Sequence, residues 1–204
     1  MNVDSNVKDV IRKALPKAIS YDGYKFLVSN LITEGKATGY TQSEAYLNYS
    51  KLSEQRMKRW DKVFKLSDDD KLFLDSLNRP ITFLTISEGW CGDAAHALPV
   101  LNKIAEYTPE ITLKVVLRDE NDELMNHFLT NGSKSIPKLI ALSEDLQVLF
   151  TWGARPSAAK KLVNDYKEKH GKLTPEFKEE LQRWYNKDKG RTIVDDIINA
   201  LKSL

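Results

Sequence analysis

An apolar run at residues 81–86 leads directly into the segment Trp-Cys-Gly-Asp-Ala at residues 90–94, and a helical pattern follows. This order predicts a buried strand, a tight turn and a helix that begins at the cysteine. Cys91 is the only cysteine among the 204 residues. Unpaired backbone N–H groups and the helix dipole favour a thiolate at a helix start. The position of Cys91 therefore makes it a candidate nucleophile.

Four short segments, in order along the chain, resemble the thioredoxin superfamily. Trp90-Cys91-Gly92 is similar to the start of the Trp-Cys-Gly-Pro-Cys signature, and Pro99 stands where thioredoxins kink the following helix. Ser135-Ile136-Pro137 is similar to the segment with the cis proline, and Trp152-Gly153-Ala154 to the segment before the last helix. The resemblance covers about residues 78 to 170. It implies an α/β, thioredoxin-like fold in which helices flank a central mixed sheet.

Three residues depart from the thioredoxin pattern. Ala94 stands where the resolving cysteine would be, Asp93 replaces the proline, and Thr85 replaces an aspartate that relays protons in many thioredoxins. With one cysteine, the chain cannot reduce a disulfide through an internal dithiol. The Cys-Gly-Asp-Ala sequence occurs in bacterial thioredoxin-like proteins, and the resemblance implies membership of such a subgroup.

The composition is that of an ordinary soluble domain, with 41% hydrophobic residues, 29% charged residues and a net charge of +2. We expect neither a nucleic acid nor a membrane as a partner. The start, Met1-Asn2-Val3-Asp4, lacks the basic and apolar pattern of a signal peptide. Because a lone thiol stays reduced in the cytoplasm, we expect a cytoplasmic protein.

No metal-ligand spacing surrounds Cys91, and we expect neither a metal nor a cofactor. His96 would lie about 140° around the helix from Cys91, which argues against a catalytic Cys-His pair. His127 and His170 are expected at the surface.

The pattern divides the chain into a helical N-terminal extension at residues 1–78, a thioredoxin-like core at 79–170 and a C-terminal helical extension at 171–204. We expect the first extension to pack on the sheet, because its helices need an apolar surface to cover. Thr41-Gln42-Ser43-Glu44 has capping-box spacing and predicts the start of a long helix. Ser67 is a second predicted N-cap.

Within the core, the order strand, helix, strand, helix, strand, strand, helix is that of thioredoxin. Beyond the first strand, further strands are predicted at residues 111–117, 138–142 and 147–152, and a helix at 122–130. Asn131-Gly132 should end that helix, and the last two strands should form a hairpin.

Cys91 and Asp93 are the candidate catalytic residues, the first as nucleophile and the second as general acid. In thioredoxin-like proteins the cis proline faces the cysteine and the residue before it pairs with an extended substrate, so the resemblance assigns Ile136 and Pro137 to a substrate groove. The expected substrate-binding residues are Trp90, Gly92, Ile136, Pro137, Trp152 and Gly153. Structural alternatives remain open: an inert buried cysteine, a first-turn acid, a core-edge tryptophan and a turn-locking proline.

The charges around Cys91 act in opposite directions. The helix dipole favours the thiolate, whereas Asp93, and Glu88 if it lies near, oppose a second negative charge. We therefore expect a thiol less acidic than that of a dithiol thioredoxin. Lys138 or Arg155 is a candidate to reach the groove and offset Asp93.

Three classes of function remain open. The favoured one is a monothiol thiol-disulfide oxidoreductase or thiol-transfer protein, in which Cys91 reacts with a client disulfide and an external low-molecular-weight thiol such as glutathione resolves the product. The second is a redox-inactive binding module for a peptide or client protein. The third is a homodimer through the aromatic residues of the N-terminal helices, which alternatively only cap the sheet. These aromatic residues are Tyr40, Tyr46, Tyr49, Trp60 and Phe64.

Overall fold

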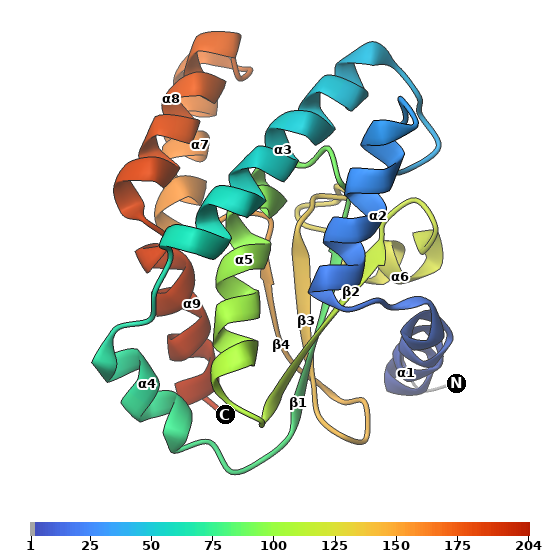
Figure 1. The fold of residues 1–204 in the computed structure, drawn as a ribbon. Helices are drawn as coiled ribbons and strands as arrows, with labels where there is room; N and C mark the ends of the chain where they lie inside the picture. Colours follow the sequence, from blue (N-terminus) through green and yellow to red (C-terminus); the bar gives the residue numbers. More distant parts are fainter. Residues whose placement is uncertain (1–2) are drawn as a thin grey trace.

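The computed structural model describes residues 3–204. The prediction that the start of the chain lacks a signal-peptide pattern rests partly on Met1 and Asn2, which lie outside the described residues. Figure 1 shows the elements along the chain. Before the first strand come α1 (Val3–Ala14), the 3-10 helix η1 (Leu15–Lys17), α2 (Tyr21–Thr33), α3 (Glu44–Val63) and α4 (Asp68–Asp75). The core follows with β1 (Ile81–Ser87), α5 (Gly92–Tyr107), β2 (Ile111–Leu117), α6 (Asp122–His127), β3 (Lys138–Leu142) and β4 (Val148–Gly153). The chain ends with α7 (Ser157–His170), α8 (Pro175–Asp188) and α9 (Arg191–Lys202).

A four-stranded mixed sheet, in the order β2-β1-β3-β4, forms the centre of the molecule. β1 runs parallel to β2, with Ile81 opposite Ile111 and Ser87 opposite Leu117. β3 lies antiparallel to β1 on the other side, and β4 lies antiparallel to β3. The predicted mixed sheet and the terminal hairpin are confirmed.

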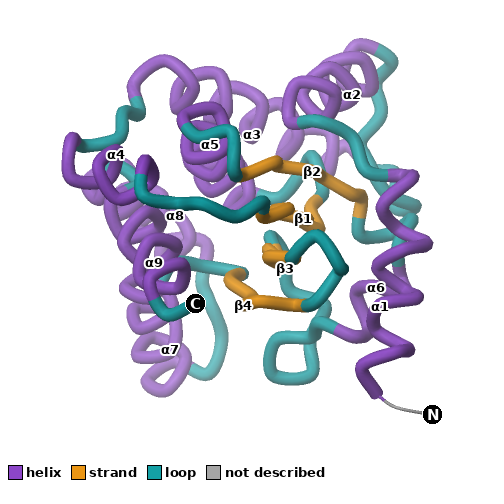
Figure 2. The backbone as a smooth tube through the Cα atoms, turned by 90° about the horizontal axis from the view of Figure 1, so that it is seen from below, coloured by secondary structure: helices purple, strands orange, loops and turns teal. Residues whose placement is uncertain are grey.

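Helices cover both faces of this sheet (Figure 2). α5 lies on one face, in contact with α3 and α9, whereas α1 and α6 pack together on the other. Ile19, just before α2, exchanges two backbone hydrogen bonds of 2.9 and 2.8 Å with Val115 at the β2 edge. Across residues 3–204, no helix combines the length and the apolar character that crossing a bilayer demands.

The terminal helices contact the core and each other. Trp60 of α3 lies edge-on to His96 of α5, with ring centroids 5.6 Å apart. Arg191 of α9 donates two hydrogen bonds of 2.7 Å to Asp70 of α4. Burial acts to raise the pKa of Asp70, but the hydrogen bonds from Arg191 lower it to about 2. The domain boundaries at residues 78 and 170 stay a prediction.

The start of α3 corrects the sequence prediction. α3 begins at Glu44 with Ser43 as its N-cap, two residues later than the box predicted from Thr41. The Ser43 hydroxyl accepts the hydrogen bond from the third backbone N–H of the helix. Gln42 instead turns its side chain back to the backbone of Ala37, which keeps this stretch in a loop.

The end of α6 is a second correction. The helix stops at His127 and does not reach Thr130 as predicted. Thr130 and Ser133 exchange backbone hydrogen bonds of 2.9 and 3.0 Å, and Asn131 and Gly132 adopt positive φ angles between them. A tight turn therefore replaces the last helical turn. β4 lies one residue later than predicted at both of its ends.

The aromatic residues of the N-terminal helices fall into two groups. Trp60 and Phe64 are buried in the core, and Tyr46 is half-buried. Tyr40 and Tyr49 are 79% and 54% exposed. Trp60 and Phe64 therefore serve the core, as the alternative interpretation of these aromatic residues predicted. A homodimer through the exposed Tyr40 and Tyr49 stays a prediction.

Candidate functional site around Cys91

Cys91 occupies the turn between β1 and α5. It is the N-cap of α5, and its Sγ accepts a hydrogen bond of 3.5 Å from the backbone N–H of Ala94. Its own backbone N–H donates to the carbonyl oxygen of Glu88 at 3.0 Å. The sulfur thus takes the position that a serine or aspartate oxygen usually takes at a helix start. Cys91 is only 7% exposed.

The segment before β3 faces the thiol. Cys91 donates a hydrogen bond of 3.3 Å to the carbonyl oxygen of Ile136, and the Ile136–Pro137 peptide bond is cis. Gly153, at the end of β4, has a φ of 120°, and a Cβ there would lie 2.1 Å from the carbonyl oxygen of Pro137. Only glycine fits so close to this backbone. The structure brings these four residues together, and their roles toward a substrate stay a prediction.

Asp93, in the first turn of α5, is held by residues from the C-terminal part of the chain. Arg155 Nη2 lies 2.8 Å from one carboxylate oxygen, and the Tyr185 hydroxyl donates to the other at 2.9 Å. Burial raises the pKa of Asp93, whereas Arg155 and Tyr185 act to lower it. Arg155 therefore offsets the charge of Asp93 as hypothesised, and Lys138 instead donates to Thr130 at 3.3 Å.

Burial also governs the thiol. Burial, followed by the charge of Asp93, raises the pKa of Cys91 to about 12. Backbone N–H groups of Ala94 and Asp93, and the Arg155 guanidinium, act in the other direction. The direction agrees with the expectation of a weakly acidic thiol. At neutral pH this arrangement holds a protonated thiol, consistent with its donation to Ile136.

Comparison with known proteins decides the family. A family model described as Thioredoxin matches residues 39–167, more than half of the chain. The chain belongs to the thioredoxin family. A crystal structure of a protein of unknown function from Pseudomonas aeruginosa is similar at 15% identity and a TM-score of 0.59, over 91% of this chain and 98% of that one. A crystal structure of an HIV epitope scaffold is similar at 16% identity and a TM-score of 0.58, over 91% and 99%. These identities show the fold alone, and no curated protein matches this sequence.

In this thioredoxin-family chain, Glu88 anchors the loop before the cysteine. Glu88 is fully buried, and its Oε1 accepts a hydrogen bond of 2.9 Å from the backbone N–H of Asp119. The next residue, Gly89, donates its N–H to the Thr38 hydroxyl at 2.7 Å. Burial raises the pKa of Glu88. The Glu88 carboxylate thus ties the loop to Asp119, and the Gly89 N–H ties it to Thr38.

Thr85 stands at the position of the thioredoxin proton-relay aspartate, and it does not take over that role. Thr85 is fully buried in β1, and its hydroxyl has no hydrogen-bond partner within the described residues. Tyr24 of α2 forms a buried hydrogen bond of 3.1 Å with Ser87, at the end of the same strand. Burial raises the pKa of Tyr24, so neither Thr85 nor Tyr24 supplies a titrating group at neutral pH.

The two predicted tryptophans lie differently from each other. Trp90 is half-buried, with the Arg118 guanidinium 4.9 Å from its ring centroid and Tyr46 packed edge-on at 5.0 Å. Trp152 is 9% exposed, and its indole N–H donates to Asp196 of α9 at 2.9 Å. Trp90 therefore lies in the loop that leads to the thiol, whereas the polar edge of Trp152 faces α9.

Sequence reasoning missed residues that complete the site from distant helices. Arg56 of α3 lies over Gly92, where an added Cβ would be 3.0 Å from its Nη1. His96 stacks on Tyr185 of α8, with centroids 4.2 Å apart, and pairs with Gln182 at 2.8 Å. Burial lowers the pKa of His96 to about 4. No local pattern marks these residues, because their proximity arises only when α3 and α8 pack beside α5.

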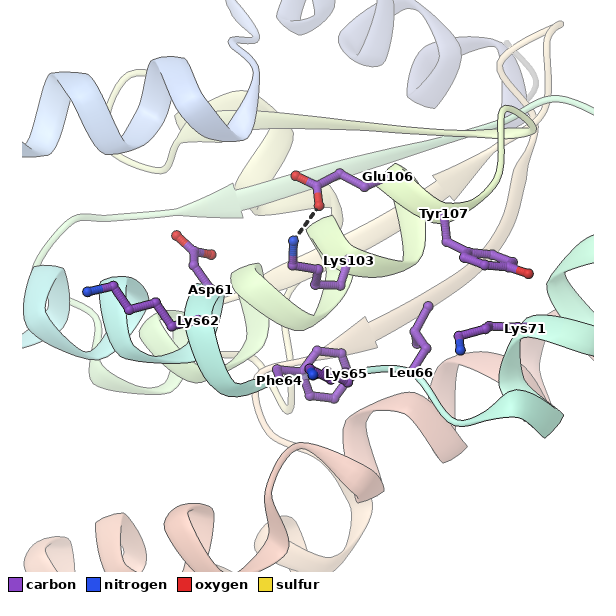
Figure 3. A pocket seen from close by; sticks show the side chains of 9 residues that line it. All are labelled: Asp61, Lys62, Phe64, Lys65, Leu66, Lys71, Lys103, Glu106 and Tyr107. Atoms are coloured by element: carbon purple, nitrogen blue, oxygen red, sulfur yellow. Dashed lines mark hydrogen bonds and ion pairs between the residues drawn. The ribbon is translucent and has the colours of Figure 1, made fainter.

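A separate hollow of ≈ 470 Å³ lies near the other end of α5 (Figure 3). Tyr107, which lines it, ends the helix that Cys91 begins, and a rise of about 1.5 Å per residue separates the two by about 24 Å. Its lining includes Phe64 and Leu66 with several lysines, among them Lys103. The hollow is therefore distinct from the Cys91 site. Within residues 3–204, no cluster of three or more His, Cys, Asp or Glu side chains is placed to hold a metal ion.

Proposed function

We propose that this thioredoxin-family protein is a monothiol thiol-transfer protein with Cys91 as its nucleophile. The observation that carries the proposal is the placement of the only cysteine at the N-cap of α5, hydrogen-bonded to Ile136 and beside Pro137. Because the chain has no second cysteine, an external thiol such as glutathione must resolve any mixed disulfide formed on Cys91.

Two exchange steps make up the reaction. The Cys91 thiol loses its proton and attacks a disulfide, so that a new S–S bond forms to Cys91 while the substrate S–S bond breaks. The departing thiolate takes up a proton. An external thiolate then attacks the mixed disulfide, carries the transferred group away as a disulfide and returns Cys91 as a thiol. One disulfide is consumed and one is formed in each step, so no other oxidant or reductant is needed.

The raised pKa of Cys91 determines the character of this exchange. Few molecules hold the thiolate at neutral pH, so the mixed disulfide forms slowly. A thiolate of high pKa is also a poor leaving group, so the mixed disulfide is resolved slowly. Both effects favour a protein that carries a thiol-bound group over a rapid disulfide reductase.

Asp93 is the proton carrier in this proposal. It lies two residues after Cys91, burial raises its pKa, and Arg155 and Tyr185 fix its orientation. A carboxyl group of raised pKa is suited to proton transfer near neutral pH. Asp93→Asn should slow the formation of the mixed disulfide with glutathione disulfide. A faster reaction in this variant would show that the Asp93 charge only opposes the thiolate.

The predicted substrate groove has unequal support among its members. Ile136 and Pro137 have the strongest, because the Ile136 carbonyl already accepts a hydrogen bond from the thiol. Trp90 and Gly92 flank Cys91 in sequence, and Gly153 packs on Pro137. Trp152 has the weakest support, because its indole N–H is bound to Asp196.

One observation favours the second candidate function, a redox-inactive binding module. Cys91 is 7% exposed and donates a hydrogen bond to Ile136 as a neutral thiol. Both properties are typical of an inert cysteine. In that case the groove binds a peptide or client protein without any covalent step.

A single reaction separates the two candidates. Folded protein is incubated with glutathione disulfide, and its intact mass is followed before and after addition of free glutathione. Thiol transfer predicts one adduct that free glutathione removes, and none in Cys91→Ser. A binding module predicts no adduct in the folded protein, although the urea-unfolded chain reacts.

The cellular setting belongs to the same proposal. A reduced Cys91 and a pool of low-molecular-weight thiol are both found in the cytoplasm, which is where we place the reaction. A client-protein disulfide is the alternative to a small disulfide as substrate. A homodimer through the exposed Tyr40 and Tyr49 is testable by light scattering, since a single monomeric mass would exclude it.

A further inference from the structure

A cavity of ≈ 530 Å³ lies at the end of the sheet where β3 begins and β4 ends. β3, β4 and the loop after α6 line one part of it, and α7 and α9 line the rest. Its polar lining includes Lys138, Arg155, Ser157, Lys160, Asp196 and Asn199. The cavity adjoins the Cys91 site, because Arg155 also binds Asp93 and Lys138 directly follows Pro137.

Lys138 has an unusual setting in this cavity. It is 7% exposed, and its ammonium group donates to the Thr130 hydroxyl at 3.3 Å. No carboxylate in the described part of the chain lies within ion-pair distance of it. Burial, and then the neighbouring charge of Lys160, lowers its pKa. An ammonium group buried without a counter-charge is costly, so an anion bound beside Lys138 would stabilise it.

Two other cations, Lys160 and Arg155, line the same cavity. Lys160, on the exposed side of α7, has no carboxylate partner among residues 3–204. Arg155 uses Nη2 for Asp93, but its Nε is buried and forms no hydrogen bond within the described structure. The cavity therefore combines the ammonium group of a buried lysine, that of an exposed lysine and the side chain of an arginine that is paired with Asp93.

The carboxylate in the lining, Asp196, forms no ion pair with these cations. Asp196 accepts hydrogen bonds from the Trp152 indole at 2.9 Å, from the Ser157 backbone at 2.8 Å and from the Ser157 hydroxyl at 2.7 Å. These donors already occupy both of its oxygens. Asp196 thus fixes the wall of the cavity. Its single negative charge offsets only one of the two lysines, so Lys138 and Lys160 together leave an excess of positive charge for a ligand.

We propose that this cavity binds the carboxylate or phosphate group of a small ligand. The proposal rests on the proposed function in one respect: the ligand is the low-molecular-weight thiol or disulfide that exchanges at Cys91. Lys138 and Lys160 supply the charge, and Arg155 lines the cavity beside them. Because Arg155 contacts both the cavity and Asp93, an anion here binds on the side of the cavity that is shared with the Cys91 site.

Titrations of the Cys91→Ser protein test the site without any covalent step. Inorganic phosphate, glutathione disulfide and coenzyme A are the probes, and the reporter is the indole N–H signal of Trp152 in NMR spectra, assigned with Trp152→Phe. Loss of one charged hydrogen-bond partner typically costs about 1.5 to 3 kcal/mol, so Lys160→Gln should weaken binding by about tenfold or more. Added salt should weaken it further.

Lys161→Gln is the matched control. Lys161 is the next residue on α7, pairs with Asp165 at 2.7 Å and does not line the cavity. Its substitution should leave the binding constant unchanged. Lys138→Met is a second test of the cavity, with its urea unfolding curve measured in parallel so that loss of binding is not confused with loss of the fold.

Each outcome decides the proposal. Saturable binding of phosphate and coenzyme A identifies a phosphate source, and binding of glutathione disulfide alone identifies a carboxylate source. No saturable shift with any probe, or equal weakening by Lys160→Gln and Lys161→Gln, overturns the anion site. Because the titrations use Cys91→Ser, an unreactive Cys91 in the native protein would refute thiol transfer and leave the measured anion site intact.

Discussion

At each end of α5 a tyrosine hydroxyl donates to an aspartate, but the two bonds lie in different surroundings. Tyr185 donates to Asp93 at 2.9 Å, and its side chain is 1% exposed. Tyr107 donates to Asp75 at 3.0 Å and is 37% exposed. Water can replace the exposed Tyr107–Asp75 hydrogen bond but not the buried Tyr185–Asp93 bond. The two bonds therefore contribute unequally to stability, although their lengths are nearly equal.

The ion pairs near the two ends repeat this contrast. Arg155 and Asp93 are 29% and 12% exposed, whereas Lys103 and Glu106 are 34% and 52% exposed. A buried carboxylate depends on its partner, and an exposed pair contributes little. At the Cys91 end of α5 the charged groups are partly removed from water, which costs desolvation free energy, whereas at the Tyr107 end they stay solvated. The Cys91 thiol lies at the desolvated end.

The largest expected effect comes from removing the half-buried Arg155 guanidinium. Arg155→Leu removes the ion-pair partner of the Asp93 carboxylate, which is only 12% exposed, and should lower the free energy of unfolding by about 3 kcal/mol. Lys103→Met, at the exposed end, should lower it by less than about 1 kcal/mol. Urea unfolding curves measure both. Equal losses in the two variants would contradict the contrast between the ends.

An effect of comparable total size is expected from pH, through His96. Its pKa is about 4 in the folded protein against about 6.5 in the unfolded chain, so between these values the unfolded chain binds the extra proton. Stability should therefore fall as the pH is lowered from 6.5 to 4, by up to about 1.4 kcal/mol per unit. His96→Gln should lack this part of the slope, because glutamine does not titrate. Carboxylates such as Asp93 titrate in both proteins, so their contribution cancels when the two slopes are compared. Identical slopes would show that His96 is not held neutral by burial.

The matched tyrosines give the smallest effect and the sharpest control. Tyr185→Phe removes one buried hydrogen bond and should lower the free energy of unfolding by about 1 to 2 kcal/mol. It should also raise the pKa of Asp93 further, since a bond that lowers it is lost. Tyr107→Phe should leave the unfolding curve unchanged. NMR titration of the Asp93 carboxyl would detect the change, and an unaltered pKa would deny Tyr185 this role.

Local signals predicted the parts of the fold that local chemistry determines. Ser67 caps α4 in a full capping box, and the strand at 111–117 has the bounds that its apolar run predicted. The capping prediction at Thr41 was wrong because a neighbouring glutamine found a backbone partner instead. Local signals compete in such places, and only the packed structure decides between them.

The candidate site divides in the same way. Cys91, Ile136 and Pro137 could be named from motifs, and Arg155 from its position after the Gly153 loop. Tyr185 could not be named, because it reaches Asp93 from a helix far along the chain. Burial of the thiol depends on that same packing, so its pKa was open to prediction only in direction.

The rate of Cys91 alkylation, measured against pH in the folded protein, tests the central claim most directly. A covered but usable nucleophile predicts modification at Cys91 that is slow at pH 7 and accelerates by about tenfold per pH unit beyond pH 9, as the thiolate fraction grows. Cys91→Ser should give no product. A plateau reached below pH 8 would contradict the covered, neutral thiol. Absence of reaction at every pH at which the protein remains folded would contradict thiol transfer.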